Sequence, residues 1–188
     1  MDDEPYDRIL KLLLVGDSGV GKTSLMFKYA DQIFLDQETW QTSLFDFKSK
    51  TIQMDGKLIK LQIWHARRRE RYHTMTSSLA SRCRGTAAIM VLYDVTDRKT
   101  FNHVSGWLRT IGSHVGDHMV RMIVGCKSDL EEERMVGRKE GEELAMEHNV
   151  DFAEVSAKDG HGVEETFQTL VRSVIEKERK SKSDDIPM

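Results

Sequence analysis

Short apolar runs alternate with longer amphipathic stretches along the chain. Four runs are compact and rich in aliphatic side chains, as is typical of buried strands: residues 9–15, 87–93, 119–125 and 150–155. Residues 45–54 and 57–64 alternate more loosely on either side of Asp55-Gly56, a dipeptide that favours a hairpin turn. Between these runs, the pattern predicts helices over residues 24–30, 100–115, 138–149 and 162–179.

Strands that alternate with helices predict an α/β fold, with a six-stranded, mainly parallel sheet covered by helices on both faces. The hairpin would add one antiparallel edge strand. Residues 31–44 show no clean period and are expected to form a long loop. We predict one domain over residues 1–176, followed by a polar, disordered tail over residues 177–188.

One loop of this arrangement carries a recognisable chemistry. Gly16 to Thr23 reads GDSGVGKT and fits the phosphate-binding pattern G-x-x-x-x-G-K-S/T, between a predicted strand and a predicted helix. Glycines let successive N–H groups face an anion, and the helix N-terminus adds partial positive charge. Lys22 is expected to reach the β- and γ-phosphates, and the Thr23 hydroxyl to ligate Mg²⁺. The alternative is a glycine turn that matches by chance. The predicted phosphate-binding residues are Ser18, Gly19, Val20, Gly21, Lys22, Thr23 and Ser24.

Composition narrows the possible partners and compartment. The net charge of −3 gives no basic field, so no nucleic-acid partner is expected. The chain has no apolar run of 18 residues and no apolar signal segment. Its two cysteines, Cys83 and Cys126, suit a reducing compartment. These features favour a soluble cytoplasmic protein, which we expect to be a monomer. His103 is expected to be a surface or loop residue, and Trp107 to take part in helix packing.

Two further loops follow predicted strands. Cys126-Lys127-Ser128-Asp129 and Ser156-Ala157-Lys158 resemble the base-recognition motifs of small guanine-nucleotide-binding proteins, Asn-Lys-x-Asp and Ser-Ala-Lys. Guanine presents two neighbouring N–H donors that the Asp129 carboxylate can accept, whereas adenine would leave that carboxylate unpaired. The Lys127 stem is expected to cover the base, and the Ala157 N–H to donate to guanine O6. The alternative is that Asp129 and Ser156 serve only as turn or helix caps.

Cys126 departs from this motif. The family's Asn resembles a clamp that bonds the base and ties its loop to the P-loop, and a thiol is a weak donor and acceptor. Without the hydrogen bonds of that Asn, nucleotide binding is expected to be weaker by roughly 1–3 kcal/mol, or about 5- to 150-fold in affinity. Guanine selectivity through Asp129 is expected to survive this change.

From about Tyr6 to Ile175 the chain resembles the Rab proteins, small GTPases that regulate vesicle traffic. The segments that carry the resemblance are Asp46–Lys48, Lys60–Trp64, Glu70–Tyr72, Thr76–Ser78, Arg84-Gly85 and Tyr93–Thr96. The resemblance implies a P-loop NTPase G-domain that binds GTP or GDP with Mg²⁺. It implies that effector and regulator proteins bind Thr42–Lys48 and His65–Arg84. It also implies that Thr42 senses the γ-phosphate and ligates Mg²⁺, and that Phe34 stacks on the base edge, unless Phe34 packs within its loop.

The second switch departs most from the family. Residues 65–70 read HARRRE where relatives read DTAGQE. His65 cannot supply the anionic acceptor that holds Mg²⁺ through water, and Arg68 is bulkier than glycine. Arg69 has donors but no acceptor, so it cannot replace the glutamine that orients the attacking water. Hydrolysis is therefore expected to be impaired. Arg67 to Arg69 could contact the γ-phosphate, form a solvated loop or bind an acidic partner.

Two functions remain open from the sequence. One is a Rab-like protein whose bound nucleotide controls partner docking, and the other is a pseudo-GTPase interaction module that binds nucleotide weakly or constitutively. A P-loop kinase would leave Asp129 without a role. Because no cysteine follows Cys126, this chain is not expected to carry a C-terminal lipid. It would work unanchored, or peripherally on vesicle membranes if a missing tail carried the lipid.

Overall fold

The computed structural model describes residues 5–35, 47–65, 83–114 and 119–184. Its strands are β1 (Arg8–Gly16), β2 (Phe47–Met54), β3 (Lys57–His65), β4 (Ala88–Asp94), β5 (Val120–Cys126) and β6 (Asp151–Val155). Its helices are α1 (Lys22–Asp31), α3 (Arg98–Asn102), α4 (Val104–His114), the single 3₁₀ turn η2 (Glu131–Glu133), α5 (Arg138–His148) and α6 (Val163–Asp184).

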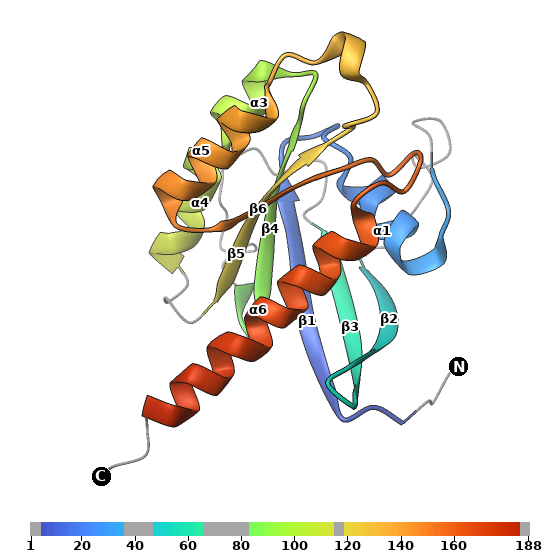
Figure 1. The fold of residues 1–188 in the computed structure, drawn as a ribbon, viewed down its shortest axis with the longest axis vertical. Helices are drawn as coiled ribbons and strands as arrows, with labels where there is room; N and C mark the ends of the chain where they lie inside the picture. Colours follow the sequence, from blue (N-terminus) through green and yellow to red (C-terminus); the bar gives the residue numbers. More distant parts are fainter. Residues whose placement is uncertain (1–4, 36–46, 66–82, 115–118, 185–188) are drawn as a thin grey trace.

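The strands form one six-stranded sheet in the order β2-β3-β1-β4-β5-β6 (Figure 1). The edge strand β2 is antiparallel to β3, and all other neighbours are parallel, which confirms the predicted fold class. In register, Gly16 lies beside Leu92, and Cys126 lies between Asp94 and Val155. The loops after β1, β4, β5 and β6 therefore leave the same edge of the sheet, where ligands of such folds bind.

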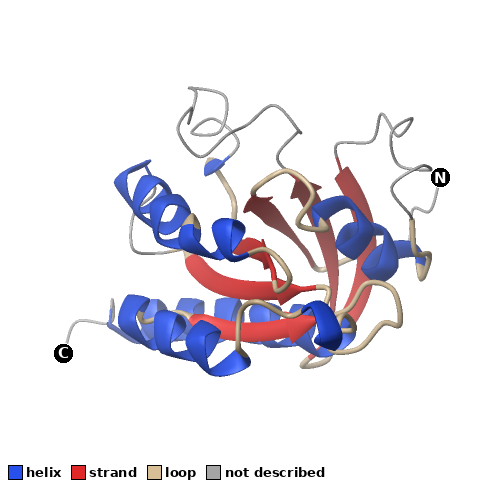
Figure 2. Cartoon of the chain, turned by 90° about the horizontal axis from the view of Figure 1, so that it is seen from above, coloured by secondary structure: helices blue, strands red, loops and turns tan. Residues whose placement is uncertain are grey.

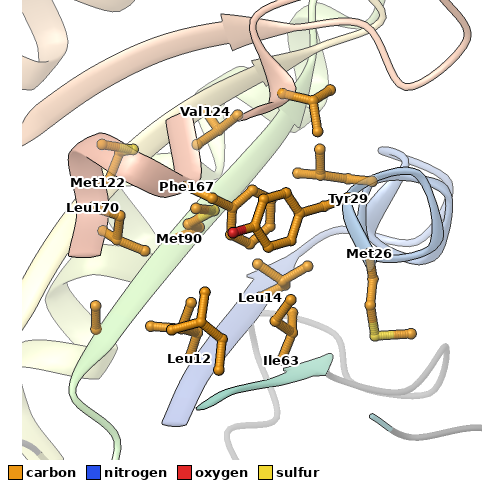
Figure 3. Packing of buried hydrophobic residues seen from close by; sticks show 14 of the residues in the cluster. Leu12, Leu14, Met26, Tyr29, Ile63, Met90, Met122, Val124, Phe167 and Leu170 are labelled. Atoms are coloured by element: carbon orange, nitrogen blue, oxygen red, sulfur yellow. The ribbon is translucent and has the colours of Figure 1, made fainter. Parts of the chain in front are cut away.

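Helices cover both faces of the sheet (Figure 2). Alternate residues of β1 supply the two cores, because successive side chains of a strand point to opposite faces. Leu12 and Leu14 pack in the cluster formed with α1 and α6, whereas Leu13 and Val15 pack in the cluster with α4 and α5. In the first cluster the Tyr29 ring stacks on another aromatic ring, Phe167, at 3.8 Å between centroids (Figure 3).

The predicted helix over 100–115 is interrupted. It begins earlier, because the Asp97 side chain accepts a hydrogen bond from the Lys99 N–H at 2.9 Å and caps α3. At His103 the backbone N–H is paired with the Phe101 carbonyl, which ends α3. The Trp107 N–H donates to the His103 carbonyl at 3.0 Å in the first turn of α4. His103 therefore lies at a junction between two helices.

The C-terminal helix is longer than the predicted helix over residues 162–179, and residues 177–184 of the predicted disordered tail are helical. Helix α6 continues to Asp184, and only residues 185–188 of the predicted tail lie outside the described residues. The Arg8 guanidinium donates to both Glu178 oxygens at 2.8 and 2.7 Å, and Arg179 pairs with Asp55 at 2.7 Å. These contacts tie the polar turns of α6 to β1 and to the hairpin.

Candidate nucleotide-binding site

The loop from Gly16 to Gly21 has the backbone that its glycines predict. Gly19 and Gly21 have φ of 86° and 105°, a region that L side chains rarely adopt. Gly21 is the N-cap of α1 and supplies no side-chain cap to the first turn. The helix therefore presents its amide groups and its partial positive charge at the end of the loop, an arrangement that suits an anion.

Lys22 folds back under this loop. Its side chain is 8% exposed, and its ammonium donates to the carbonyls of Gly16 at 2.8 Å and Asp17 at 2.6 Å. Val20 is fully buried in the core, so only its backbone can face a ligand. The remaining predicted residues, Ser18, Gly19, Gly21, Thr23 and Ser24, are exposed or half-buried.

The hydroxyls of the first turn of α1 differ in their surroundings. Ser24 Oγ donates to the Leu35 carbonyl at 3.1 Å and ties α1 to the segment that follows it. The Thr23 hydroxyl is bonded to no residue in the described part of the chain, and its oxygen is of the kind that Mg²⁺ prefers. Thr42, its predicted partner as a metal ligand, lies outside the described residues.

The loop after β5 places Lys127 and Asp129 at the same edge of the sheet as the P-loop. Lys127 has φ of 65°, and its ammonium lies 2.5 Å from the carboxylate of Asp94 at the end of β4. Thr96 donates to the other Asp94 oxygen through its N–H and hydroxyl. Asp129 is half-buried and accepts no hydrogen bond from the described residues. Its carboxylate is therefore left for donors from outside the described chain.

In the loop after β6, the Ser156 side chain shapes the loop. Ser156 is fully buried, and its hydroxyl accepts hydrogen bonds from the Lys158 and Asp159 N–H groups at 3.2 and 3.3 Å. The Ser156 N–H itself donates to the His161 carbonyl at 3.0 Å. This turn leaves Ala157 half-buried and Lys158 exposed.

Cys126 lies against the P-loop, where the family has Asn. The thiol side chain is 4% exposed, and its Cβ lies 3.7 Å from the position that a Cβ on Gly21 would occupy. Burial raises the pKa of this thiol to about 12, with a further increase from the Asp94 carboxylate. At neutral pH the thiol is uncharged. The two loops therefore meet here in an apolar contact.

On its other side the P-loop is bonded to the α3–α4 junction. One Asp17 oxygen lies 2.5 Å from His103 Nδ1, and the other accepts a hydrogen bond from Trp107 Nε1 at 3.0 Å. His103 was expected to be a surface or loop residue; it does lie in the turn between α3 and α4, but its side chain is only 18% exposed. Trp107 packs in the core as expected and also donates to the loop. In the sequence, His103 and Trp107 are two ring N–H donors four residues apart, and this spacing is the feature that could have indicated the pair.

Other predicted residues stand apart from these loops or lie outside the described residues. Phe34 is 43% exposed, and residues 36–46 of the loop that follows it lie outside the described residues. His65 is half-buried at the end of β3, in register with Leu14 just before the P-loop. The rest of the second switch, residues 66–82, lies outside the described residues.

A P-loop after the central strand, with two candidate base-binding loops at the same edge of the sheet, is the arrangement of a P-loop GTPase fold. A sequence model of the Ras family matches residues 11–176. The Ras-related protein Rab-10 of Diplobatis ommata is 43% identical over 178 residues, which cover 94% of this chain and 86% of that protein. The Ras-related protein Rab-8B of Homo sapiens is 42% identical over 180 residues, 95% of this chain and 84% of that protein.

The chain therefore belongs to the Ras family, among the Rab-type small GTPases. Relative to the motifs that the resemblance implies, Cys126 and His65 are departures. In the described parts of the chain, no helix combines the length and the apolar character needed to cross a bilayer.

Proposed function

We propose that this chain binds GTP or GDP with Mg²⁺ and uses the bound nucleotide to control partner docking in vesicle traffic, with impaired GTP hydrolysis. The observation that carries the proposal is the Asp129 carboxylate, which has no hydrogen-bond donor among the described residues and lies at the edge of the sheet that bears the P-loop. A half-buried carboxylate in that place is best explained by a ligand with paired N–H donors, as guanine has.

Backbone N–H groups and the Lys22 side chain would hold the phosphates of the nucleotide. The N–H groups of residues 18–21 and the start of α1 would bind the phosphate oxygens, and Lys22 would offset the charge of the β- and γ-phosphates. Thr23, with Thr42, would hold Mg²⁺, which would offset the negative charge of the phosphates. The Lys127 stem, Ala157 and Lys158 would surround the base.

Impaired hydrolysis follows from the chemistry of the second switch. Catalysis of phosphoryl transfer rests on positioning of water and stabilisation of charge. His65 lies at the end of β3, where the family's aspartate would help to hold Mg²⁺, and an imidazole provides no carboxylate. Arg69 stands at the water-orienting position and has no acceptor. We therefore expect a long-lived GTP-bound form.

Partner docking would use Thr42–Lys48 and His65–Arg84. At the described end of the first segment, the Phe47 ring stacks on Trp64 at 4.6 Å between centroids and remains 44% exposed. An exposed aromatic ring is a common anchor for a protein partner. Lys48 beside it pairs with Asp31 at 2.6 Å.

A second candidate function is a pseudo-GTPase, a docking module that binds nucleotide weakly or constitutively. The apolar contact between Cys126 and Gly21 favours it, because this contact replaces a position at which the family hydrogen-bonds both base and P-loop. Identifying the nucleotide released from heat-denatured purified protein separates the two. About one GTP or GDP per chain supports the first function, and an empty protein supports the second.

Two further measurements sharpen this test. A single-turnover assay with loaded GTP should give a rate well below that of an intact small GTPase, and a normal rate would overturn the claim of impaired hydrolysis. The variant Cys126→Asn should tighten guanine-nucleotide binding by about 5- to 150-fold relative to the parent protein, while Cys126→Ala should not. Equal affinities in Cys126→Asn and Cys126→Ala would show that this position does not limit binding.

A further inference from the structure

Asp17 places a carboxylate within the loop that is built to receive phosphates. A negative charge in that position would repel the phosphates unless donors hold and partly neutralise it. Both Asp17 oxygens are occupied by donors from the α3–α4 junction, His103 Nδ1 at 2.5 Å and Trp107 Nε1 at 3.0 Å. The side chains of Asp17 and His103 are 19% and 18% exposed, so water competes little for these contacts.

The same residue also holds the P-loop lysine. The Asp17 carbonyl accepts a hydrogen bond from Lys22 Nζ at 2.6 Å, and the adjacent Gly16 carbonyl accepts another at 2.8 Å. The direction in which these carbonyls point depends on the peptide planes beside Asp17. Anchoring the Asp17 side chain therefore restrains the backbone that positions Lys22.

We propose that His103 is a positioning residue for nucleotide binding, which acts through Asp17 to hold the P-loop and Lys22 in the phosphate-binding arrangement. The inference rests on the proposed function, because it assumes that the ligand of the P-loop is a guanine nucleotide. His103 suits this role better than Trp107, because Trp107 is also a core residue of α4 and its removal would damage packing. His103 sits at the helix junction and contacts the loop through its ring nitrogen.

The test measures dissociation of a fluorescent GDP analogue in excess GDP and Mg²⁺. His103→Leu should release the nucleotide about tenfold faster, a change at the low end of what a hydrogen bond to a charged group contributes. His103→Asn should recover most of the loss, because the amide nitrogen of Asn occupies roughly the place of Nδ1 and keeps a donor. The matched control is His148→Leu, since His148 is another half-buried histidine and bonds Ser105 of α4 at 3.0 Å, away from the loop.

A double-mutant cycle tests whether the effect runs through Asp17. Adding His103→Leu to Asp17→Ala should change the dissociation rate by less than about twofold. If His103→Leu accelerates release equally in both backgrounds, its effect does not pass through the Asp17 carboxylate and the proposal is wrong.

A second readout needs no nucleotide. In nucleotide-free protein, amide hydrogen exchange in residues 18–23 should be about tenfold faster in His103→Leu than in the parent or in His148→Leu. If the parent protein binds no guanine nucleotide, the proposed function fails, and the exchange rates still decide the role of His103. Unchanged exchange in His103→Leu would overturn the inference.

Discussion

Gly16 is the position where β1 passes into the P-loop, and it should tolerate no side chain. We expect Gly16→Ala to destabilise the fold severely. Its φ is +138°, and a Cβ built there would lie 2.3 Å from the Leu92 carbonyl oxygen of the neighbouring strand β4. Reaching even the shortest real contact of 3.0 Å requires a shift of 0.7 Å, and the obstacle is backbone, which cannot rotate away as a side chain can.

Two costs add at this residue. A non-glycine residue in a sparsely populated backbone region costs about 1–3 kcal/mol. Overpacking in a close-packed interior costs about 1–3 kcal/mol more. The sum of about 2–6 kcal/mol is a large part of the ~5–15 kcal/mol by which a domain is stable. Gly16 is thus required by the sheet as well as by the anion site.

Gly56→Ala is the matched control. Gly56 also has positive φ, +74°, but nothing lies within 4 Å of the Cβ position. It should show only the backbone cost of about 1–2 kcal/mol. Urea unfolding followed by circular dichroism gives both free energies. If Gly16→Ala is no less stable than Gly56→Ala, the close approach of β1 and β4 does not constrain this residue.

Three other predictions address the site and the surface. In competition titrations, Asp129→Ala should weaken GDP binding by about 10- to 100-fold and leave ADP binding unchanged, because only guanine pairs with the carboxylate. Equal losses of affinity for GDP and ADP would show that Asp129 does not distinguish the two bases. Burial raises the pKa of Cys126 to about 12, so little of the reactive thiolate is present in the folded protein at pH 8. Its alkylation by iodoacetamide, followed by mass spectrometry, should therefore be about 10³-fold slower in folded than in urea-unfolded protein, and similar rates would contradict this. The Arg98 guanidinium, and then the Gly137 N–H, lower the pKa of Glu140 to about 2, so its stabilising effect is complete above the unfolded pKa of about 4.3 and is lost as pH falls toward 2. The difference in unfolding free energy between the parent and Glu140→Gln should accordingly shrink between pH 5 and pH 3 in urea titrations, and a constant difference would refute the pairing.

The sequence predicted the parts of the fold that apolar periodicity reports. The strands β1, β4 and β5 are continuous apolar runs because both of their faces are buried, and all three were found within a residue or so of their ends. The end of α6 was missed. Near its predicted end, Glu178 and Arg179 pair with Arg8 and Asp55, more than 100 residues away in the chain, and no local pattern contains that information.

In the candidate site, too, some residues could be predicted from the sequence and others could not. Its ligand-facing residues lie in contiguous motifs whose spacing is set by loop geometry, so they could be identified from the sequence. The residues that hold those motifs could not, because His103 and Asp94 come from other elements and reach the loops only in the folded chain. Ser156 was predicted to belong to the nucleotide site or to serve as a cap, and its hydroxyl accepts hydrogen bonds within its own loop.

The P-loop is thus held on two sides by contacts of different kinds. Toward the base loop it meets Cys126, a neutral thiol in apolar contact with Gly21. Toward the α3–α4 junction it is fixed at the Asp17 carboxylate by ring nitrogens of His103 and Trp107. Dispersion between a few atoms is weak and has little directionality, whereas hydrogen bonds to a carboxylate are strong and directional. The position of the loop is therefore set mainly from the α3–α4 side. We expect the phosphates to contribute a larger share of nucleotide affinity here than in relatives that keep the asparagine, because the phosphate-binding backbone is firmly held while its link to the base loop is loose.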